Sequence, residues 1–442
     1  MWEDCPPGPT DQREVINRTR LKYISMKRSE KRILLCLAHM SGNEMKYIQE
    51  AFATNWVVPL GPNVNGFEED LAQFCSNGEK RVVALSAGTA AVHLALLACG
   101  VKAGDEVLVQ SFTFCASANP VTYIGAKPVF VDSEKDTWNM DPELLEAAII
   151  DRTEKTGQKP KAIVLVYLYG MPAKINEIVA VAKKYDIPLI EDAAEGLGSE
   201  YDGRVVGTFG QYGVLSFNGN KMITTSGGGA LICPDDDAKG HIMYLATQAR
   251  ESYPYYQHTE IGFNYRMSNI CAGIGRGQMT VLKEHIEHHR HIADIYREGF
   301  KDIDGITFHD ETDDCMRSNF WLNTITLDEH LAVVGQEDVY QEMVKGAVGG
   351  AAGFVHESDN VHTDCEPNAN VEAMRIFLDK ANIESRPLWK PMHKQPVYMS
   401  SPAYTNGVSE ELFRCGLCLP SGPCVTEEEA RFIIAMVKEA IR

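Results

Sequence analysis

The chain has 442 residues, a formal net charge of −19, 44% hydrophobic residues and 23% charged residues. This length suits two domains, and the composition is that of a soluble globular protein. The negative charge argues against a broad nucleic-acid-binding surface, and the apolar runs are shorter than the ~18–20 residues of a membrane span. Twelve scattered cysteines without a secretory signal predict reduced thiols and a cytoplasmic location.

Strand-like and helix-like segments alternate over residues 81–235, after an N-terminal arm over residues 1–30 that we expect to be poorly ordered. Continuous apolar strands separated by helices predict an α/β fold with a mainly parallel, seven-stranded sheet covered on both faces. Ligands of such sheets bind at the carboxyl ends of the strands, so the residues after each strand are the first candidates for a site. The predicted strands are 81–86, 106–111, 127–132, 161–170, 187–192, 212–218 and 229–234, and the predicted helices are 89–100, 142–151 and 175–186.

The pattern changes after about residue 265. Residues 269–303 are predicted to form one long helix that links two domains. We therefore expect a large domain over residues 31–285 and a smaller C-terminal α+β domain over residues 286–442. Residues 335–370 are Gly-rich and weakly patterned, and they are interpreted as an insert on the smaller domain.

Two groups of metal-ligating residue types occur, and both favour a structural interpretation. Four histidines in "HIEHHRHIADI" lack a carboxylate or cysteine placed to complete a metal shell, so a solvated or inter-subunit helix face is expected. They are His285, His288, His289 and His291. Cys415 and Cys418 form a lone C-x-x-C, which favours buried small side chains before a turn. No metal is predicted.

Polar residues at three strand ends have the functional groups that one cofactor requires. The hydroxyls of Ser86 and Thr89 and the amides of a helix start could bind phosphate, or they could serve only the turn. Asp192, at the end of "LIED", could cap a helix or hold a cationic ring nitrogen. Lys221 lies in the polar loop of "LSFNGNKMITTSGGGALI". An amine that binds an aldehyde covalently, a carboxylate that keeps a pyridine nitrogen protonated and a phosphate site are what pyridoxal phosphate (PLP) requires.

The segment "EDAAEGLGSEYDGRVVGTFGQYGVLSFNGNKMITTSGGGALI" and the motif "GFNYRMSNI" resemble the nucleotide-sugar aminotransferases of the DegT/DnrJ/EryC1/StrS family. The resemblance runs from about residue 35 to the C-terminus, apart from the Gly-rich insert. It implies the fold type I architecture of aspartate-aminotransferase-like enzymes and a homodimer whose active sites lie at the subunit boundary. A dehydratase branch of the family has histidine in place of the lysine, so Lys221 favours transamination.

The resemblance also implies individual roles for residues. Lys221 would hold the cofactor covalently and move the proton, and Asp192 would pair with the pyridinium nitrogen. Phe114 would stack on the ring, with an ordinary core position as the alternative, and Glu195 would lie near the ring substituents. The phosphate would be bound by Gly88, Thr89 and Ser216, and by Asn264 of the partner chain.

The predicted reaction moves an amino group from L-glutamate to C4 of a UDP-linked 4-keto-6-deoxy-N-acetylhexosamine, for surface glycan synthesis. Residues 55–71 and 383–398 resemble the branch that acts at C4, and the second segment most resembles enzymes that make UDP-4-amino-4,6-dideoxy-N-acetylglucosamine in the bacillosamine pathway. One candidate substrate residue is Arg266, which would meet the donor carboxylate from the neighbouring subunit. Arg386, Lys390 and His393 would lie near the diphosphate or the sugar, with solvated surface as the alternative for the lysine and the arginine. The alternatives are a GDP-linked 4-keto sugar, a 3-keto sugar, a cyclitol ketone, or a non-catalytic PLP-binding regulatory protein.

Overall fold

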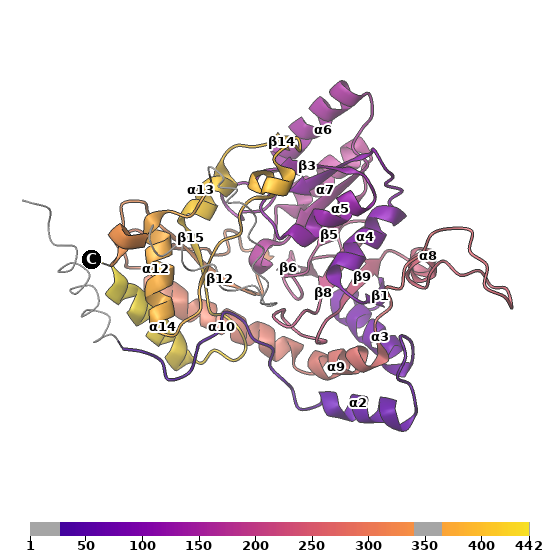
Figure 1. Cartoon of the computed structure of the whole chain (residues 1–442), viewed down its shortest axis with the longest axis horizontal. Helices are drawn as coiled ribbons and strands as arrows, with labels where there is room; N and C mark the ends of the chain where they lie inside the picture. The colour runs from indigo at the N-terminus through magenta and orange to yellow at the C-terminus, as the bar shows by residue number, and fades with distance from the viewer. Residues whose placement is uncertain (1–26, 340–364, 442) are drawn as a thin grey trace, which may run out of the picture.

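The structure, a computed structural model, describes residues 27–339 and 365–441 (Figure 1). Most of the predicted arm and most of the predicted Gly-rich insert lie outside these ranges. The described end of the arm is attached to the C-terminal half, because Ser29 N–H donates to the Ala381 carbonyl at 3.1 Å. Within the described residues, every helix is too short or too polar to cross a membrane.

The described residues form one large sheet of eight strands, with a mainly parallel arrangement as predicted. Only β9 runs antiparallel to its neighbours within this sheet. The eighth strand, β14, was not predicted; it comes from the C-terminal half and pairs in parallel with β3. In spatial order the strands are β1 (Arg81–Leu85), β9 (Gly229–Cys233), β8 (Tyr212–Ser216), β5 (Leu189–Asp192), β4 (Ala162–Val166), β2 (Glu106–Gln110), β3 (Lys127–Val131) and β14 (Ala403–Tyr404).

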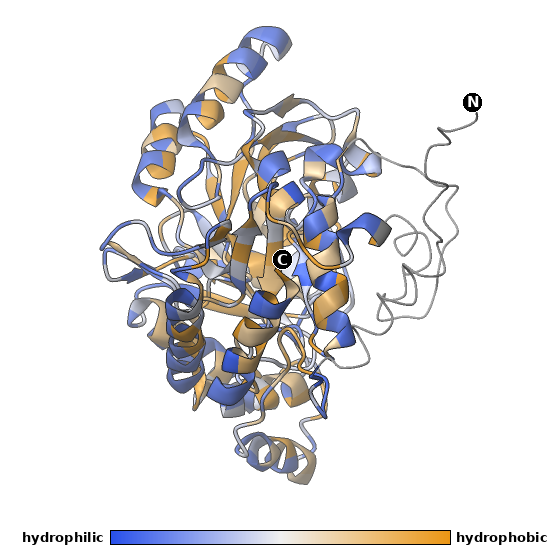
Figure 2. Cartoon of the chain, turned by 90° about the vertical axis from the view of Figure 1, so that its left-hand side faces the viewer, coloured by the Kyte–Doolittle hydropathy of each residue, from blue (hydrophilic) through white to orange (hydrophobic). Residues whose placement is uncertain are grey.

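Both faces of the large sheet are buried, because successive side chains on a strand point to opposite faces. In β1, Val82 packs into one core with α3, and Val83 packs into the other core with α4. Figure 2 shows the resulting pattern, with hydrophobic strands enclosed by helices whose outer sides are hydrophilic. The first face is covered by α3 (Pro62–Ser76), α6 (Pro142–Thr156) and α7 (Ile175–Tyr185), and the second by α4 (Gly88–Ala98), α5 (Asn119–Tyr123) and α8 (Asp236–Ala246).

A second, antiparallel sheet has its own hydrophobic core, which includes Ile325 and Leu417. A small third sheet joins the two halves of the chain, because β11 from the C-terminal half pairs with β6. The second sheet contains β10 (Ile306–Phe308), β12 (Asn323–Leu327), β15 (Gly416–Leu419) and β13 (Arg386–Pro387), and its helices are α10 (Leu282–Phe300), α12 (Ala369–Lys380) and α14 (Glu427–Ala440). The remaining elements named here are β6 (Glu200–Tyr201), β7 (Arg204–Val205), β11 (Met316–Arg317), α2 (Glu44–Ala53), α9 (Asn269–Met279) and α13 (Val408–Cys415).

The long helix predicted over residues 269–303 is two helices, α9 and α10. The chain tightens between them, because the N–H groups of Thr280 and Val281 bond to carbonyls three residues back and the Thr280 hydroxyl donates to the Gly277 carbonyl at 2.6 Å. The predicted domain boundary at residues 285/286 falls inside α10, which contributes Ile286 to one core and Tyr296 to the other.

Candidate active site

A cavity of about 350 Å³ lies at the carboxyl ends of the central strands of the large sheet. Its walls combine the loops after β5 and β8, the start of α4 and two tryptophans from the C-terminal half of the chain. The predicted residues that line it are Gly88, Thr89, Phe114, Asp192, Glu195, Ser216 and Lys221. These predicted residues therefore lie together at the carboxyl ends of the strands, where ligands of such sheets bind.

The N-terminus of α4 faces this cavity without a side-chain cap. Its N-cap residue, Ala87, makes no capping hydrogen bond from a side chain. Glycine is required where the strands approach the helix start, because a Cβ on Gly229 would lie 2.4 Å from the backbone N of Gly88. Backbone N–H groups at this helix start lie beside the hydroxyls of Thr89 and Ser216, a combination whose chemistry suits a phosphate.

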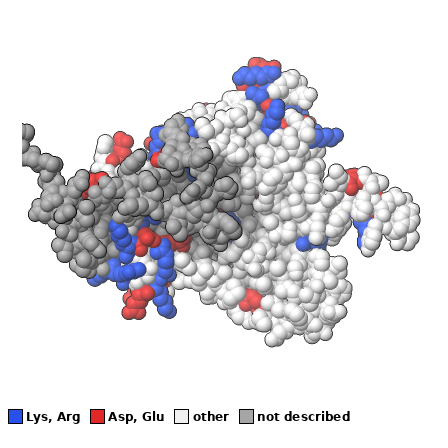
Figure 3. Space-filling view, in the orientation of Figure 1, with Lys and Arg blue, Asp and Glu red and all other residues white. Residues whose placement is uncertain are grey.

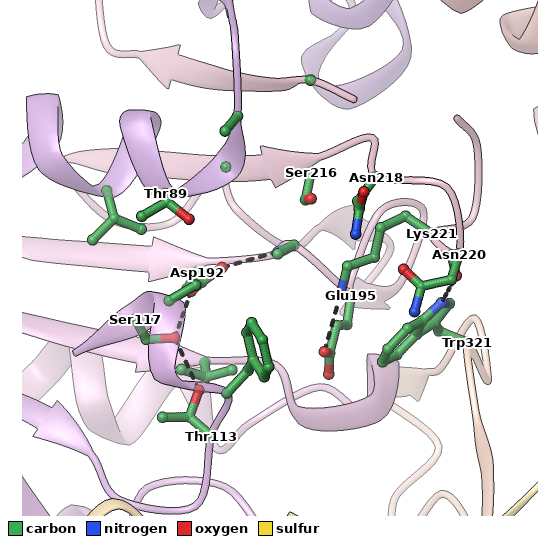
Figure 4. A pocket seen from close by; sticks show the side chains of 18 of the residues that line it. Thr89, Thr113, Ser117, Asp192, Glu195, Ser216, Asn218, Asn220, Lys221 and Trp321 are labelled. Atoms are coloured by element: carbon green, nitrogen blue, oxygen red, sulfur yellow. Dashed lines mark hydrogen bonds and ion pairs between the residues drawn. The ribbon is translucent and has the colours of Figure 1, made fainter. Parts of the chain in front are cut away.

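Asp192, the last residue of β5, supplies the central carboxylate of the site. Its side chain is buried and accepts hydrogen bonds from the Ser117 hydroxyl at 2.7 Å and from Ala194 N–H at 3.1 Å. Thr113 in turn lies 2.9 Å from the Ser117 hydroxyl (Figure 4). Burial raises the pKa of Asp192, so a cation placed beside it would stabilise its charged form.

The neighbouring carboxylate, Glu191, belongs to the opposite face of the sheet. It is fully buried and accepts hydrogen bonds from the Tyr167 hydroxyl and from Gly207 N–H, the latter at 2.8 Å. Because neighbouring strand residues point to opposite faces, only one of the two acids can reach the cavity. Glu191 therefore anchors the loop after β7, and Asp192 is the acid that lines the cavity.

The Lys221 amine projects into the cavity between an acid and an aromatic ring (Figure 4). Its Nζ lies 3.2 Å from Oε1 of Glu195 and 4.0 Å from the ring centroid of Trp321. Glu195 is buried, and its Oε2 accepts a hydrogen bond from Tyr169 N–H at 2.7 Å. Burial raises the pKa of Glu195 to about 7, so this acid can gain or lose a proton near neutral pH.

Phe114 is an exposed aromatic residue on the wall of the cavity, with 54% of its surface accessible. The alternative of an ordinary core position is therefore wrong. Its ring centroid lies 5.4 Å from that of Trp389, at an interplanar angle of 47°. Phe114 and Trp389 also line a second hollow of about 410 Å³, which adjoins the first.

Several lining residues were not predicted. Asn218 and Asn220 lie in the same polar loop as Lys221, so their position in the sequence could have identified them. Trp321 comes from the C-terminal half and has no local pattern that separates it from core aromatic residues. Trp389 lies in segment 383–398, so its neighbours Arg386 and Lys390 could have pointed to it. Ser117 follows Phe114 in "SFTFCAS", and its bond to Asp192 becomes visible only in the fold.

Arg266 forms an ion pair within the chain, and its predicted contact with a donor carboxylate from the neighbouring subunit stays a prediction. The guanidinium is buried, and its Nη1 donates to Glu68 at 2.7 Å and to the Ala84 carbonyl at 2.9 Å. Both printed hydrogen bonds of the guanidinium use Nη1, so this nitrogen is already engaged within the chain. Asn264 is exposed and lies outside the cavity, and its predicted contact with the phosphate of a partner chain stays a prediction.

The three predicted substrate residues of segment 383–398 have different surroundings. Arg386 is exposed and lies 3.1 Å from Glu384. His393 lies between the Ser111 hydroxyl at 2.6 Å and Glu410 at 3.2 Å, and these contacts tie the segment to the end of β2. Lys390 lines the second hollow, next to Trp389.

The four histidines of α10 point to separate partners. His288 contacts the Val425 carbonyl at 2.9 Å, His289 the Phe320 carbonyl at 3.1 Å and His291 the Glu427 carboxylate at 2.8 Å. His285 lies 3.2 Å from the Met222 carbonyl. Within residues 27–339 and 365–441, no group of three or more His, Cys, Asp or Glu side chains is arranged to hold a metal ion.

Comparisons of the sequence and of the structure with known proteins identify the family of this chain. The profile of the DegT/DnrJ/EryC1/StrS aminotransferase family matches residues 39–367 and 356–438. EpsN of Bacillus subtilis (strain 168), named as a candidate pyridoxal phosphate-dependent aminotransferase, is 46% identical over 92% of this chain and 95% of its own length. GDP-perosamine synthase of Escherichia coli O157:H7 is 33% identical over 90% of this chain and 96% of its own. A DegT DnrJ EryC1 StrS aminotransferase from Brucella abortus has a similar structure, with a TM-score of 0.76 and 28% identity, over 90% of this chain and 95% of that chain.

The fold and site are those of a PLP-dependent aminotransferase of fold type I. The chain belongs to the DegT/DnrJ/EryC1/StrS aminotransferase family, and it is a sugar aminotransferase of that family. The side chains of the cavity fit the cofactor on their own chemistry. The site offers an uncapped helix start for a phosphate, a buried carboxylate that a cation would stabilise, and an amine in the same cavity.

Proposed function

We propose that this enzyme transfers the amino group of L-glutamate to C4 of a UDP-linked 4-keto-6-deoxy-N-acetylhexosamine, as a step in surface glycan synthesis. The observation that carries the proposal is that segment 383–398, which resembles the C4 branch, places Trp389 in the wall shared by the cavity and the second hollow. A sugar whose carbonyl reaches Lys221 would therefore extend past Trp389 towards Lys390. Trp389 presents an aromatic face for a sugar ring, and Lys390 presents a cation for a diphosphate.

In this proposal each residue of the cavity has one task. When bound, PLP supplies an electron sink that allows the amino group to leave the donor and join the acceptor. Asp192 keeps the pyridine nitrogen protonated, and Phe114 packs against the ring. The amides and hydroxyls of Gly88, Thr89 and Ser216 bind the phosphate. Lys221 holds the cofactor covalently and moves a proton at the reacting carbon, and Glu195 accepts or donates a proton at the Lys221 amine.

A GDP-linked 4-keto sugar is the second candidate acceptor, because GDP-perosamine synthase of E. coli is similar over nearly the whole chain. The two candidates are separated by incubating the purified enzyme and L-glutamate with UDP-linked or GDP-linked 4-keto-6-deoxy sugar, and by measuring amino sugar by mass spectrometry. We expect kcat/KM for the UDP sugar to exceed that for the GDP sugar by about tenfold or more, since this requires only about 1.4 kcal/mol. Amination of the GDP sugar alone would show that the proposed nucleotide is wrong.

We also propose a homodimer in which each active site lies at the subunit boundary. Support comes from an apolar surface formed by α2 and the loop after it, where Met45, Phe52, Trp56 and Leu60 are exposed. Figure 3 shows few charged side chains on the part of this face that lies over α2 and α9. Light scattering after gel filtration tests the proposal, and a monomer at micromolar concentration would contradict it.

A cytoplasmic location is part of the same proposal. The described cysteines are all free thiols, as expected in a reducing compartment.

A further inference from the structure

We infer that Asn319 is a positioning residue of the active site, whose side-chain amide fixes the places of Glu195 and Trp321 relative to the Lys221 amine. Asn319 lies outside the cavity and outside the predicted set of site residues. The inference concerns the amine itself, so it holds whichever sugar is the acceptor.

One buried amide bonds to the backbone of both residues that contact Lys221. The Asn319 Nδ2 donates to the Glu195 carbonyl at 2.7 Å and to the Leu197 carbonyl at 3.0 Å. Its Oδ1 accepts from Trp321 N–H at 2.8 Å. A displacement of this amide would therefore shift the carboxylate and the indole together.

The surroundings of Asn319 leave it no room to move. The residue is fully buried, and its own N–H donates to the Ser199 hydroxyl at 2.9 Å. Gly170, at a φ of +93°, packs directly against it: an added Cβ would lie 1.9 Å from Oδ1. A glycine is needed there both for the left-handed backbone and for the close approach of the amide. The Asn319 side chain therefore fits between the loop after β4, which contains Gly170, and the loop after β5, which contains Glu195.

The far ends of Glu195 and Trp321 are held as well, which completes a rigid frame around the amine (Figure 4). Tyr169 N–H donates to Glu195 Oε2 at 2.7 Å, and Trp321 Nε1 donates to the Asn220 carbonyl, beside Lys221, at 2.7 Å. Asn319 is the member of the frame that links the C-terminal half of the chain to the loop after β5. Misplacing a reacting group by ~1 Å can lower a rate about a hundredfold, so such a link bears directly on catalysis.

The test compares Asn319→Ala with Asn370→Ala in the cofactor-loaded enzyme. Asn370 is a matched control, because its buried Nδ2 donates to two carbonyls, those of Asp328 at 2.8 Å and Leu331 at 3.3 Å, far from the cavity. Stability is measured by unfolding in urea. The absorbance of the cofactor linked to Lys221 is followed against pH to give the midpoint of its change. The steady-state kinetics give kcat and KM for L-glutamate. Titratable groups that act electrostatically with Lys221 are Glu195, Asp192 and Cys36, so a displaced Glu195 moves the midpoint.

We expect both variants to lose stability. Only Asn319→Ala should shift the midpoint, by about 0.5 pH unit or more, and lower kcat about tenfold with KM changed less than about twofold. If Asn319→Ala gives no soluble protein, Asn319→Ser is measured in the same way, with smaller changes in the same direction. A soluble Asn319 variant whose midpoint and kcat match those of Asn370→Ala would overturn the inference.

Discussion

The Lys221 ammonium lies 4.0 Å from the ring centroid of Trp321, although the two residues come from different halves of the chain. Lys221 follows β8 of the large sheet, and Trp321 precedes β12 of the second sheet. A cation over an aromatic face is stabilised by about 0.5–2 kcal/mol, more when it is shielded from water, as this one is. The contact between the reactive amine and Trp321 thus exists only when both parts of the fold are assembled.

Replacing Lys221 by alanine should leave a protein that binds PLP without a covalent link and forms no amino sugar. Activity is expected to fall by at least about a thousandfold, since no second lysine lines the cavity in the part of the chain that the structure describes. Denaturing mass spectrometry after borohydride reduction detects the link. Lys221→Arg, which keeps the charge beside Glu195, serves as the control and should be equally inactive. Unchanged turnover in Lys221→Ala would remove the central assignment.

Phe114 and Phe112 lie two residues apart but in different environments, which separates binding from stability. Phe112 is fully buried, so Phe112→Ala should cost about 3–5 kcal/mol of unfolding free energy. Phe114 is 54% exposed, and Phe114→Ala should cost less than about 1 kcal/mol. The same Phe114 variant should weaken PLP binding about three- to tenfold through the lost ring contact. Urea unfolding and fluorescence titration measure the two effects, and unaltered PLP affinity would contradict the stacking role.

Glu195 should make the stability of the cofactor-free chain fall as the pH rises. Burial raises its pKa to about 7 in the folded chain, from an ordinary 4.5, so the unfolded chain loses this proton first. The contribution to stability therefore declines between about pH 4.5 and 7 and is constant above, a loss on the order of 2–3 kcal/mol. Glu195→Gln should remove this decline. Urea unfolding at about pH 5 and about pH 8 measures it, and identical pH profiles for both proteins would show that burial does not perturb Glu195.

Arg266→Gln should destabilise the chain and spare the donor site. It leaves Glu68 buried with Lys239 as its remaining cation, at 3.0 Å, so a loss of about 3 kcal/mol is expected. The KM for L-glutamate should stay within about twofold of wild type. Adding Glu68→Gln should restore part of the stability, since the buried charge that lost its Arg266 partner is then removed. Normal stability together with a KM raised about tenfold would instead favour the predicted contact with the donor.

The sequence was informative wherever local chemistry decides the structure. All seven predicted strands form, because long apolar runs between helices are buried on both faces of a parallel sheet. Asp192 and Lys221 could be found because they follow such strands directly. The strand predicted over 161–170 ends at Val166, and a short 3-10 helix follows over Leu168–Gly170, in which Tyr169 has a left-handed φ of 55°.

Features that depend on distant partners could not be predicted. Arg266 has the charge expected of a substrate residue, but its ion pair with Glu68, which lies far away in the sequence on α3, could not be foreseen. Trp321 and Asn319 belong to the site only because the third sheet brings their segment against the loop after β5. Sequence pattern predicts which residues are polar at a strand end, and the fold alone determines which polar groups meet.

The late strand β14 has a consequence for any shortened version of this protein. Its backbone covers the outer edge of β3, through bonds from Phe130 N–H to Pro402 at 2.9 Å and from Asp132 N–H to Tyr404 at 3.0 Å. Ending the chain before residue 402 would uncover a row of unsatisfied N–H and C=O groups that can pair with another molecule. Truncated copies, including products of premature termination, should therefore associate edge to edge and precipitate.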